Sequence, residues 1–187
     1  IHNYPKRVEY AIRCLQASGI SAQNKRAILE FRDYCTLDGM SLARIDRYIG
    51  VLKQWAEIFQ KDFGNVTKEE VIKGVRIIQE NASYSPWTKA TYKMMLKRFF
   101  RWLKNSGDEQ PPETKWINAN VKRNERGLPS NGDLLTEEEV RLLVNTAEHP
   151  RDKALVATLY ESGARIGELA SLQLGNIRFD EYGAILN

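Results

Sequence analysis

Apolar side chains recur at helical spacing along most of this chain, and that periodicity constrains the fold more than any other feature. In the first 104 residues it predicts five helices, at residues 4–18, 21–38, 41–60, 67–81 and 85–104. Two helix starts carry clear signals: Thr67 and Glu70 form a capping box, and Ser85 precedes a proline at the first helical position. The sequence therefore predicts a helical bundle over residues 1–104.

Two of the predicted helices share one pattern. Tyr48 and Trp55 in the third helix stand at the same relative positions as Tyr92 and Phe99 in the fifth. Residues seven apart lie on one face of a helix, so both aromatic stripes are expected in the core. We therefore expect these two helices to pack their stripes into the same bundle.

Basic residues are concentrated in the N-terminal part of the chain. Residues 1–104 hold 19 lysines and arginines against 10 acidic residues, a balance of +9, whereas residues 105–187 hold 9 against 14, a balance of −5. Such clustering is typical of a polyanion-binding protein, although a merely solvated surface is the alternative. No segment combines a broad apolar face with a lysine-rich one, so nucleic acid is favoured over an anionic membrane as the partner.

The sequence shows no pattern for a cysteine site and no targeting signal. Cys14 and Cys35 lie neither in a CxxC pair nor beside a histidine, so we expect buried free thiols and no zinc site or disulfide framework. There is no run of about 18 apolar residues and no signal-peptide pattern. A soluble protein in the reducing cytoplasm is expected.

Two helix faces are candidate DNA-binding surfaces. On the fifth predicted helix, basic residues recur every four positions away from the apolar stripe and form a lysine ridge: Lys89, Lys93, Lys97 and Arg101. The third predicted helix carries a similar outward set: Arg44, Arg47 and Lys53. Like charges one turn apart destabilise a helix by on the order of a few tenths of a kcal/mol per pair, and phosphates would relieve this cost.

Residues 105–133 are predicted to form a linker. The periodicity breaks there, at two adjacent prolines, three glycines and several Asn, Asp and Ser residues. A basic cluster in this segment, Lys122, Arg123 and Arg126, is a candidate for following a DNA backbone, and a solvated linker without that role is equally consistent with the sequence.

Periodic structure resumes at residues 134–187. Thr136 and Glu139 form a capping box. The buried face of the helix that follows is predicted to consist of Val140, Leu143, Val144 and Ala147. Further elements are predicted at residues 150–162, 165–172, 177–179 and 184–186, the last two as strands of a hairpin. So short a unit is too small to bury the apolar faces of its elements alone, and its last strand has an unpaired edge.

Arg165 stands at the start of a predicted helix, where the helix dipole already presents positive charge. A cation is favourable there only if an anion binds beside it. Glu168 lies one turn further along and is placed to orient the guanidinium. The alternative is a purely structural ion pair between Arg165 and Glu168.

The run GARIGEL, residues 163–169, closely resembles the box around the first catalytic arginine of the tyrosine recombinases, the phage integrase family. LPSNGDLLTEEEV, residues 128–140, resembles the usual start of their catalytic domain, and the phrase around the box is most similar to archaeal integrases. The resemblance implies a mainly α chain: a SAM-like core-binding bundle at residues 1–104, a linker at 105–133, and a truncated α+β catalytic domain at 134–187.

By this resemblance, the activity is site-specific recombination of DNA. A tyrosine hydroxyl attacks a phosphodiester and forms a 3′-phosphotyrosine intermediate, with no metal or nucleotide cofactor, while Arg165 binds the phosphate and Glu168 supports it. The implied partners are duplex DNA and further protomers, a tetramer in the synaptic complex, and no membrane. The family's lysine hairpin, His-x-x-Arg helix and nucleophilic tyrosine have no match here, so this chain alone is expected to be inactive.

Two other functions remain open at this point. The chain is also consistent with a noncatalytic DNA-binding protein descended from a recombinase. A helical protein-interaction scaffold is the third possibility, and it requires that DNA binding be absent.

Overall fold

The computed structural model describes residues 3–127, 131–181 and 183–186. Contacts divide the chain into two compact units, Ile1–Gly127 and Leu128–Asn187. Residues 128–130, which open the recombinase-like phrase, and Tyr182, in the predicted hairpin turn, lie outside the described residues.

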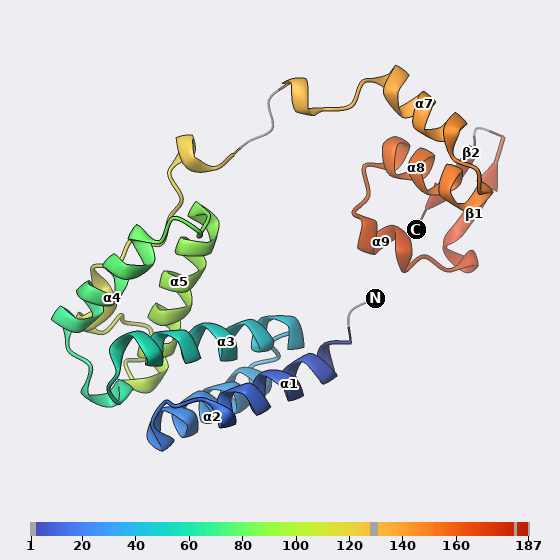
Figure 1. Cartoon of the computed structure of the whole chain (residues 1–187). Coiled ribbons are helices and arrows are strands. Elements are labelled where there is room, and N and C mark those ends of the chain that lie inside the picture. The colour runs from blue at the N-terminus through green and yellow to red at the C-terminus, as the bar shows by residue number, and fades with distance from the viewer. Residues whose placement is uncertain (1–2, 128–130, 182, 187) are drawn as a thin grey trace. The chain divides into compact units, whose positions relative to one another are not determined.

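Unit 1 is a bundle of helices (Figure 1). Its long helices are α1 (Tyr4–Ala17), α2 (Ala22–Leu37), α3 (Leu42–Phe59), α4 (Lys68–Glu80) and α5 (Pro86–Leu103). The five predicted helices are confirmed, each to within one residue at either end. Their caps explain this agreement, because Thr67 and Glu70 bond reciprocally and the Ser85 hydroxyl accepts from the Thr88 amide.

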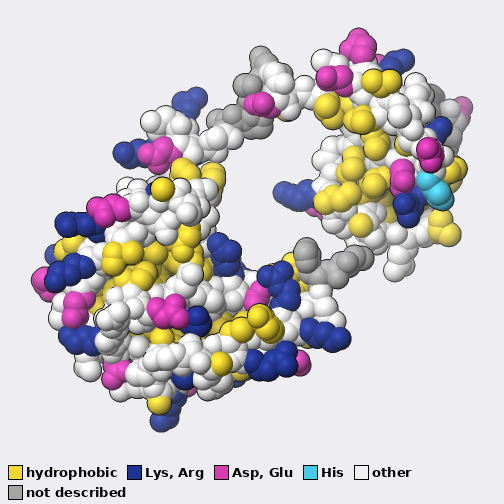
Figure 2. Space-filling view, in the orientation of Figure 1, with side chains coloured by type: hydrophobic (Ala, Val, Ile, Leu, Met, Phe, Trp, Pro, Cys, Tyr) yellow, Lys and Arg dark blue, Asp and Glu magenta, His cyan; other side chains and the backbone are white. Residues whose placement is uncertain are grey.

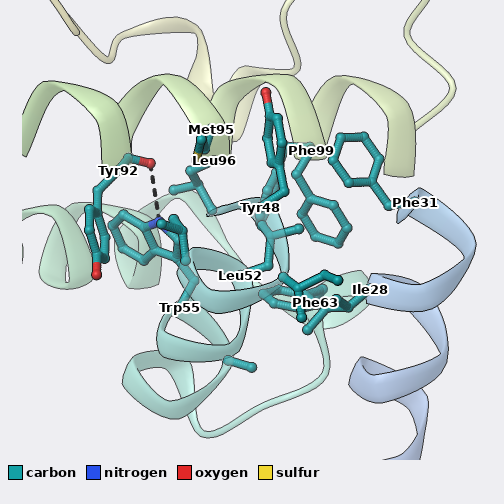
Figure 3. Packing of buried hydrophobic residues seen from close by; sticks show 14 of the residues in the cluster. Ile28, Phe31, Tyr48, Leu52, Trp55, Phe63, Tyr92, Met95, Leu96 and Phe99 are labelled. Carbon is teal, nitrogen blue, oxygen red and sulfur yellow. Dashed lines mark hydrogen bonds between the residues drawn. The ribbon is translucent and has the colours of Figure 1, made fainter. Parts of the chain in front are cut away.

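The core of unit 1 is built where α3 meets α5 (Figure 3). The Trp55 indole N–H donates to the backbone carbonyl of Tyr92 at 3.2 Å, so the ring's one polar group is satisfied inside the core. Phe31 of α2 packs edge-on against Tyr48 and Phe99, with ring centroids 5.3 Å apart in both pairs. The predicted burial of the two aromatic stripes is confirmed.

Part of the predicted linker packs on unit 1 instead of running free. We call residues 111–126 the strap; it contains the short helix α6 (Pro112–Lys115) and the turn η2 (Arg123–Glu125). Thr114, Ile117 and Val121 are buried, and α6 contacts both α4 and α5, beside which Figure 1 shows the segment in yellow-green. Thr114 is polar, and adjacent prolines with several turn-forming residues surround these positions, which is why the sequence indicated only a linker.

Unit 2 contains three helices and a hairpin in its described residues. These are α7 (Glu137–Thr146), α8 (Pro150–Ser162), α9 (Ile166–Ala170) and the antiparallel strands β1 (Ile177–Asp180) and β2 (Gly183–Leu186). The strands pair from Ile177 with Leu186 to Asp180 with Gly183. Single 3-10 turns, η3 (Asn131–Asp133) and η4 (Leu174–Asn176), precede α7 and β1.

Apolar side chains of unit 2 remain largely exposed. Val140 is buried as predicted, but Leu143 is 47% exposed, so its assignment to a buried face was wrong. Leu174, Phe179 and Ile185 are also exposed, and Figure 2 shows hydrophobic side chains gathered on the surface of this unit. The reason is size: α7 and α8 pack on each other, but the described part of unit 2 offers no further layer to cover their outer faces.

Among the described residues, no helix is both long and apolar enough to span a membrane. Both described cysteines are free; Cys35 is buried as predicted, whereas Cys14 is partly exposed. Burial raises the pKa of the Cys35 thiol to about 11, so this group stays protonated and unreactive at neutral pH.

Candidate functional site

Arg165 and Glu168 form a fixed pair at the start of α9. Gly163 ends α8 in the left-handed conformation, with φ of 61°, and this reversal lets α9 begin three residues later. Arg165 occupies the N-cap position, and its Nη1 donates to Glu168 Oε1 at 2.8 Å. Its backbone N–H donates to the other carboxylate oxygen, also at 2.8 Å. Both oxygens of one carboxylate therefore hold the same residue.

The Arg165 guanidinium is oriented but still accessible. Its side chain is 87% exposed, and Nη1 is the guanidinium nitrogen engaged by the acid. The Arg165 backbone N–H, followed by its side chain, lowers the pKa of Glu168, so the acid stays ionised at neutral pH. This arrangement suits a guanidinium that offers its remaining donors to an incoming phosphate.

The lysines of the lysine ridge contact other parts of the protein. Lys89 Nζ donates to the carbonyl of Gln79 at 2.7 Å, and Lys97 Nζ donates to the carbonyl of Ile117 at 3.0 Å. Lys93 is half-buried between them, and this burial lowers the pKa of its ammonium, with a further contribution from Lys89. These ridge lysines do not form the row of solvated charges expected from the sequence.

Arginines of α3 and α5 present a more open cationic surface. Arg44 and Arg47 are exposed on α3, and among the described residues neither makes an ion pair. Arg101 is half-buried on α5, and Arg98, one turn before it, pairs with Asp38 at 2.7 Å. We call the set Arg44, Arg47, Arg98 and Arg101 the arginine face.

Three charges of the arginine face act on one hydroxyl. Burial raises the pKa of the Tyr48 hydroxyl, and the charges of Arg98, Arg44 and Arg101 oppose this rise. Arg47 acts instead on the pKa of Tyr92, which it lowers against the effect of burial. Arg98 was not predicted from the sequence because it stands outside the four-residue ladder, although its spacing of three from Arg101 was an available signal.

The remaining residues predicted to bind DNA are Lys53, Lys122 and Arg123. Lys53 pairs with Glu57 one turn along α3 at 2.8 Å, so its charge is already partnered. Lys122 and Arg123 are exposed at the η2 turn of the strap. His149 caps α8 by accepting the Arg151 amide at 3.1 Å.

Comparison with known proteins identifies relatives over most of the chain. Tyrosine recombinase XerA of Pyrococcus horikoshii is 27% identical over 158 residues, which cover 84% of this chain and 50% of that protein. Tyrosine recombinase XerC of Natranaerobius thermophilus is 28% identical over 162 residues, 82% of this chain and 52% of that protein.

A third relative matches a shorter stretch. Tyrosine recombinase XerC of Histophilus somni is 34% identical over 85 residues, 44% of this chain and 28% of that protein. The chain thus spans about half the length of the first two relatives. No protein-family model matches it, and no solved structure gives a significant match.

Proposed function

The chain belongs to the tyrosine recombinase family, and from this premise we propose that it is the DNA-binding part of a site-specific recombinase. In this proposal unit 1 binds duplex DNA and Arg165 binds the phosphate at which strands are exchanged. The observation that carries it is the Arg165 guanidinium, which Glu168 holds in place and which is nevertheless 87% exposed. Glu168 also accepts the backbone N–H of the same residue, which fixes the guanidinium at the start of α9.

The arginine face is the proposed DNA-binding surface of unit 1. Arg44 and Arg47 are exposed without an acidic partner among the described residues, so no internal ion pair must be broken when DNA binds. Guanidinium forks match the geometry of phosphate oxygens and of guanine edges. The excess of basic residues in the first 104 positions supports the same partner.

Chemistry at Arg165 follows from the same geometry. Attack of a tyrosine hydroxyl on a phosphodiester builds negative charge on the nonbridging oxygens, and two parallel N–H donors stabilise that charge. The bond energy is conserved in the phosphotyrosine, so a 5′-hydroxyl of another strand can reseal the backbone. Such exchange needs a protomer at each cleaved strand, and we therefore propose assembly of several protomers on DNA.

Catalysis is not proposed for these 187 residues alone. The lysine, the His-x-x-Arg pair and the nucleophilic tyrosine of the family have no match in the sequence. We therefore expect the chain to bind DNA without forming a covalent adduct.

DNA binding is tested by a salt titration of affinity for duplex DNA, comparing the wild-type chain with the double variant Arg44→Ala/Arg47→Ala. Each lost phosphate contact reduces the slope of log affinity against log salt by about 0.9, so the slope of the double variant should be smaller in magnitude by about 1.8. The control is Lys68→Ala/Lys73→Ala, which removes two exposed charges from α4 outside the arginine face. Equal slopes for wild type and the arginine variant would refute the proposed surface.

A noncatalytic DNA-binding role is the second candidate. It is favoured by unit 1 itself, which has its own core and carries the whole arginine face. The discriminating measurement is cleavage of a nicked DNA substrate by a chimaera in which a relative supplies the remaining catalytic residues. A covalent adduct supports the recombinase, and tight binding without an adduct supports the noncatalytic protein.

A further inference from the structure

Three side chains, two from α5 and one from its C-cap, hold the strap at its start, middle and end. Lys104, which caps α5, lies 3.4 Å from the Glu113 carboxylate. Lys97 donates to the Ile117 carbonyl at 3.0 Å, and the indole N–H of Trp87 donates to the Arg126 carbonyl at 3.3 Å. The strap is therefore attached along the length of α5.

The strap also has its own inner face. Thr114 is fully buried, and Ile117 belongs to the hydrophobic core of the bundle. Near its end, the Arg126 guanidinium donates through Nε to the Val121 carbonyl at 3.3 Å and closes the final turn. These contacts make the strap part of unit 1 in packing as well as in hydrogen bonding.

The two acidic residues of the strap act on lysines of unit 1. Glu113 meets Lys104, and the charge of Glu125 acts on the half-buried Lys93. Lys122 and Arg123 are exposed, as is Glu125. The strap therefore offers an acceptor or an opposite charge to both Lys93 and Lys97 of the lysine ridge.

We propose that Lys97 and Trp87 are positioning residues that fix the strap on unit 1, so that the chain leaves this unit at residue 127 and not at residue 104. The inference rests on the proposed function, since its purpose is to bring both units to one DNA duplex. A released strap would lengthen the tether by residues 105–127, and the effective concentration of a tethered unit falls as the tether lengthens. Lys97 then contributes to DNA affinity through the strap, without touching DNA.

The first test measures amide hydrogen exchange in the whole chain without DNA. Lys97→Met keeps the aliphatic stem and removes the donor, so exchange in residues 112–126 should rise about tenfold while the amides of α3 and α5 are unchanged. Lys97→Arg, which retains a donor, should restore protection. Lys89→Met is the matched control, because Lys89 donates to Gln79 at the end of α4 and not to the strap. Unchanged exchange in the strap of Lys97→Met overturns the inference.

The second test is the salt dependence of DNA binding by the same variants. Lys97→Met should weaken binding by the whole chain about fivefold at every salt concentration, with the slope unchanged. A slope smaller by about 1 would show a phosphate contact at Lys97, and unaltered affinity would show that the strap does not couple the units; either result overturns the inference. Absence of DNA binding by the wild-type chain refutes the proposed function and leaves the exchange result standing, so the two failures are distinguishable.

Discussion

Arg165 combines a fixed orientation with an open guanidinium. The orientation comes from Glu168, which binds both the side chain and the backbone N–H of the same residue. Because the backbone bond does not depend on the guanidinium, the acid would keep its place in the α9 cap whatever side chain stood at position 165. A substitution at position 165 therefore tests the parallel N–H donors of the guanidinium while the local fold is retained.

At this scale we predict that Arg165→Lys, in a chimaera supplied with the remaining catalytic residues, lowers cleavage by roughly 100-fold or more, the scale seen when one donor to a developing anion is lost. Lysine keeps the charge but cannot hold two phosphate oxygens at once. Single-turnover cleavage of a nicked substrate at saturating protein measures the effect, beside a binding titration that should change little. Glu168→Gln should lower cleavage less, since it leaves the Arg165 guanidinium intact. Near wild-type cleavage by the lysine variant would return Arg165 to a structural role.

At the scale of elements, the close approach of α4 to α3 depends on a glycine. A Cβ added at Gly74 would lie 2.8 Å from Phe59 Cε1 and 3.0 Å from Trp55 Cζ3. Trp55 is fully buried and hydrogen-bonded, so it has no room to retreat. Gly74 is therefore where the two helices make contact without a side chain between them.

We predict that Gly74→Ala destabilises unit 1 by a net amount of about 1 kcal/mol, because overpacking outweighs the gain in helix propensity. Gly50→Ala is the matched change within α3, where a new Cβ meets no atom within 4 Å, and it should stabilise by about 0.5–1 kcal/mol. Urea denaturation followed by tryptophan fluorescence measures both. Stabilisation by both substitutions would contradict the proposed contact.

At the scale of the whole molecule, the two units differ in how much apolar surface they bury. Unit 1 has an extensive core, whereas Val140 alone is buried among the hydrophobic residues of unit 2 that the structure describes. All four tryptophans, Trp55, Trp87, Trp102 and Trp116, belong to unit 1. Tryptophan fluorescence therefore reports unit 1 alone, and far-ultraviolet circular dichroism reports both units.

We predict that unit 2 unfolds first, because it has little buried apolar surface to offset its conformational entropy. In urea, the loss of circular dichroism should then begin before the change in fluorescence. Val140→Ala should move only the early part of the dichroism curve, and leave the fluorescence transition where it was. Coincident transitions in the wild-type chain would show that the two units unfold as one.

The sequence by itself determined the five long helices of unit 1, their caps, the aromatic stripes and the family resemblance of residues 163–169. These features are local, since capping and helical periodicity depend on residues three or four positions apart, and so they can be recognised in one stretch of chain. The pairing of Arg165 with Glu168 was predictable for the same reason.

Only the tertiary structure decided which cations already have a partner within the protein. Lys97 meets a carbonyl 20 residues away and Arg98 meets an acid 60 residues away, and no local pattern shows that these segments pack together. The same packing turned most of a predicted linker into the strap. A charged side chain has the same helical spacing whether it faces solvent or a buried backbone carbonyl, so its partner is set by the fold of the whole bundle.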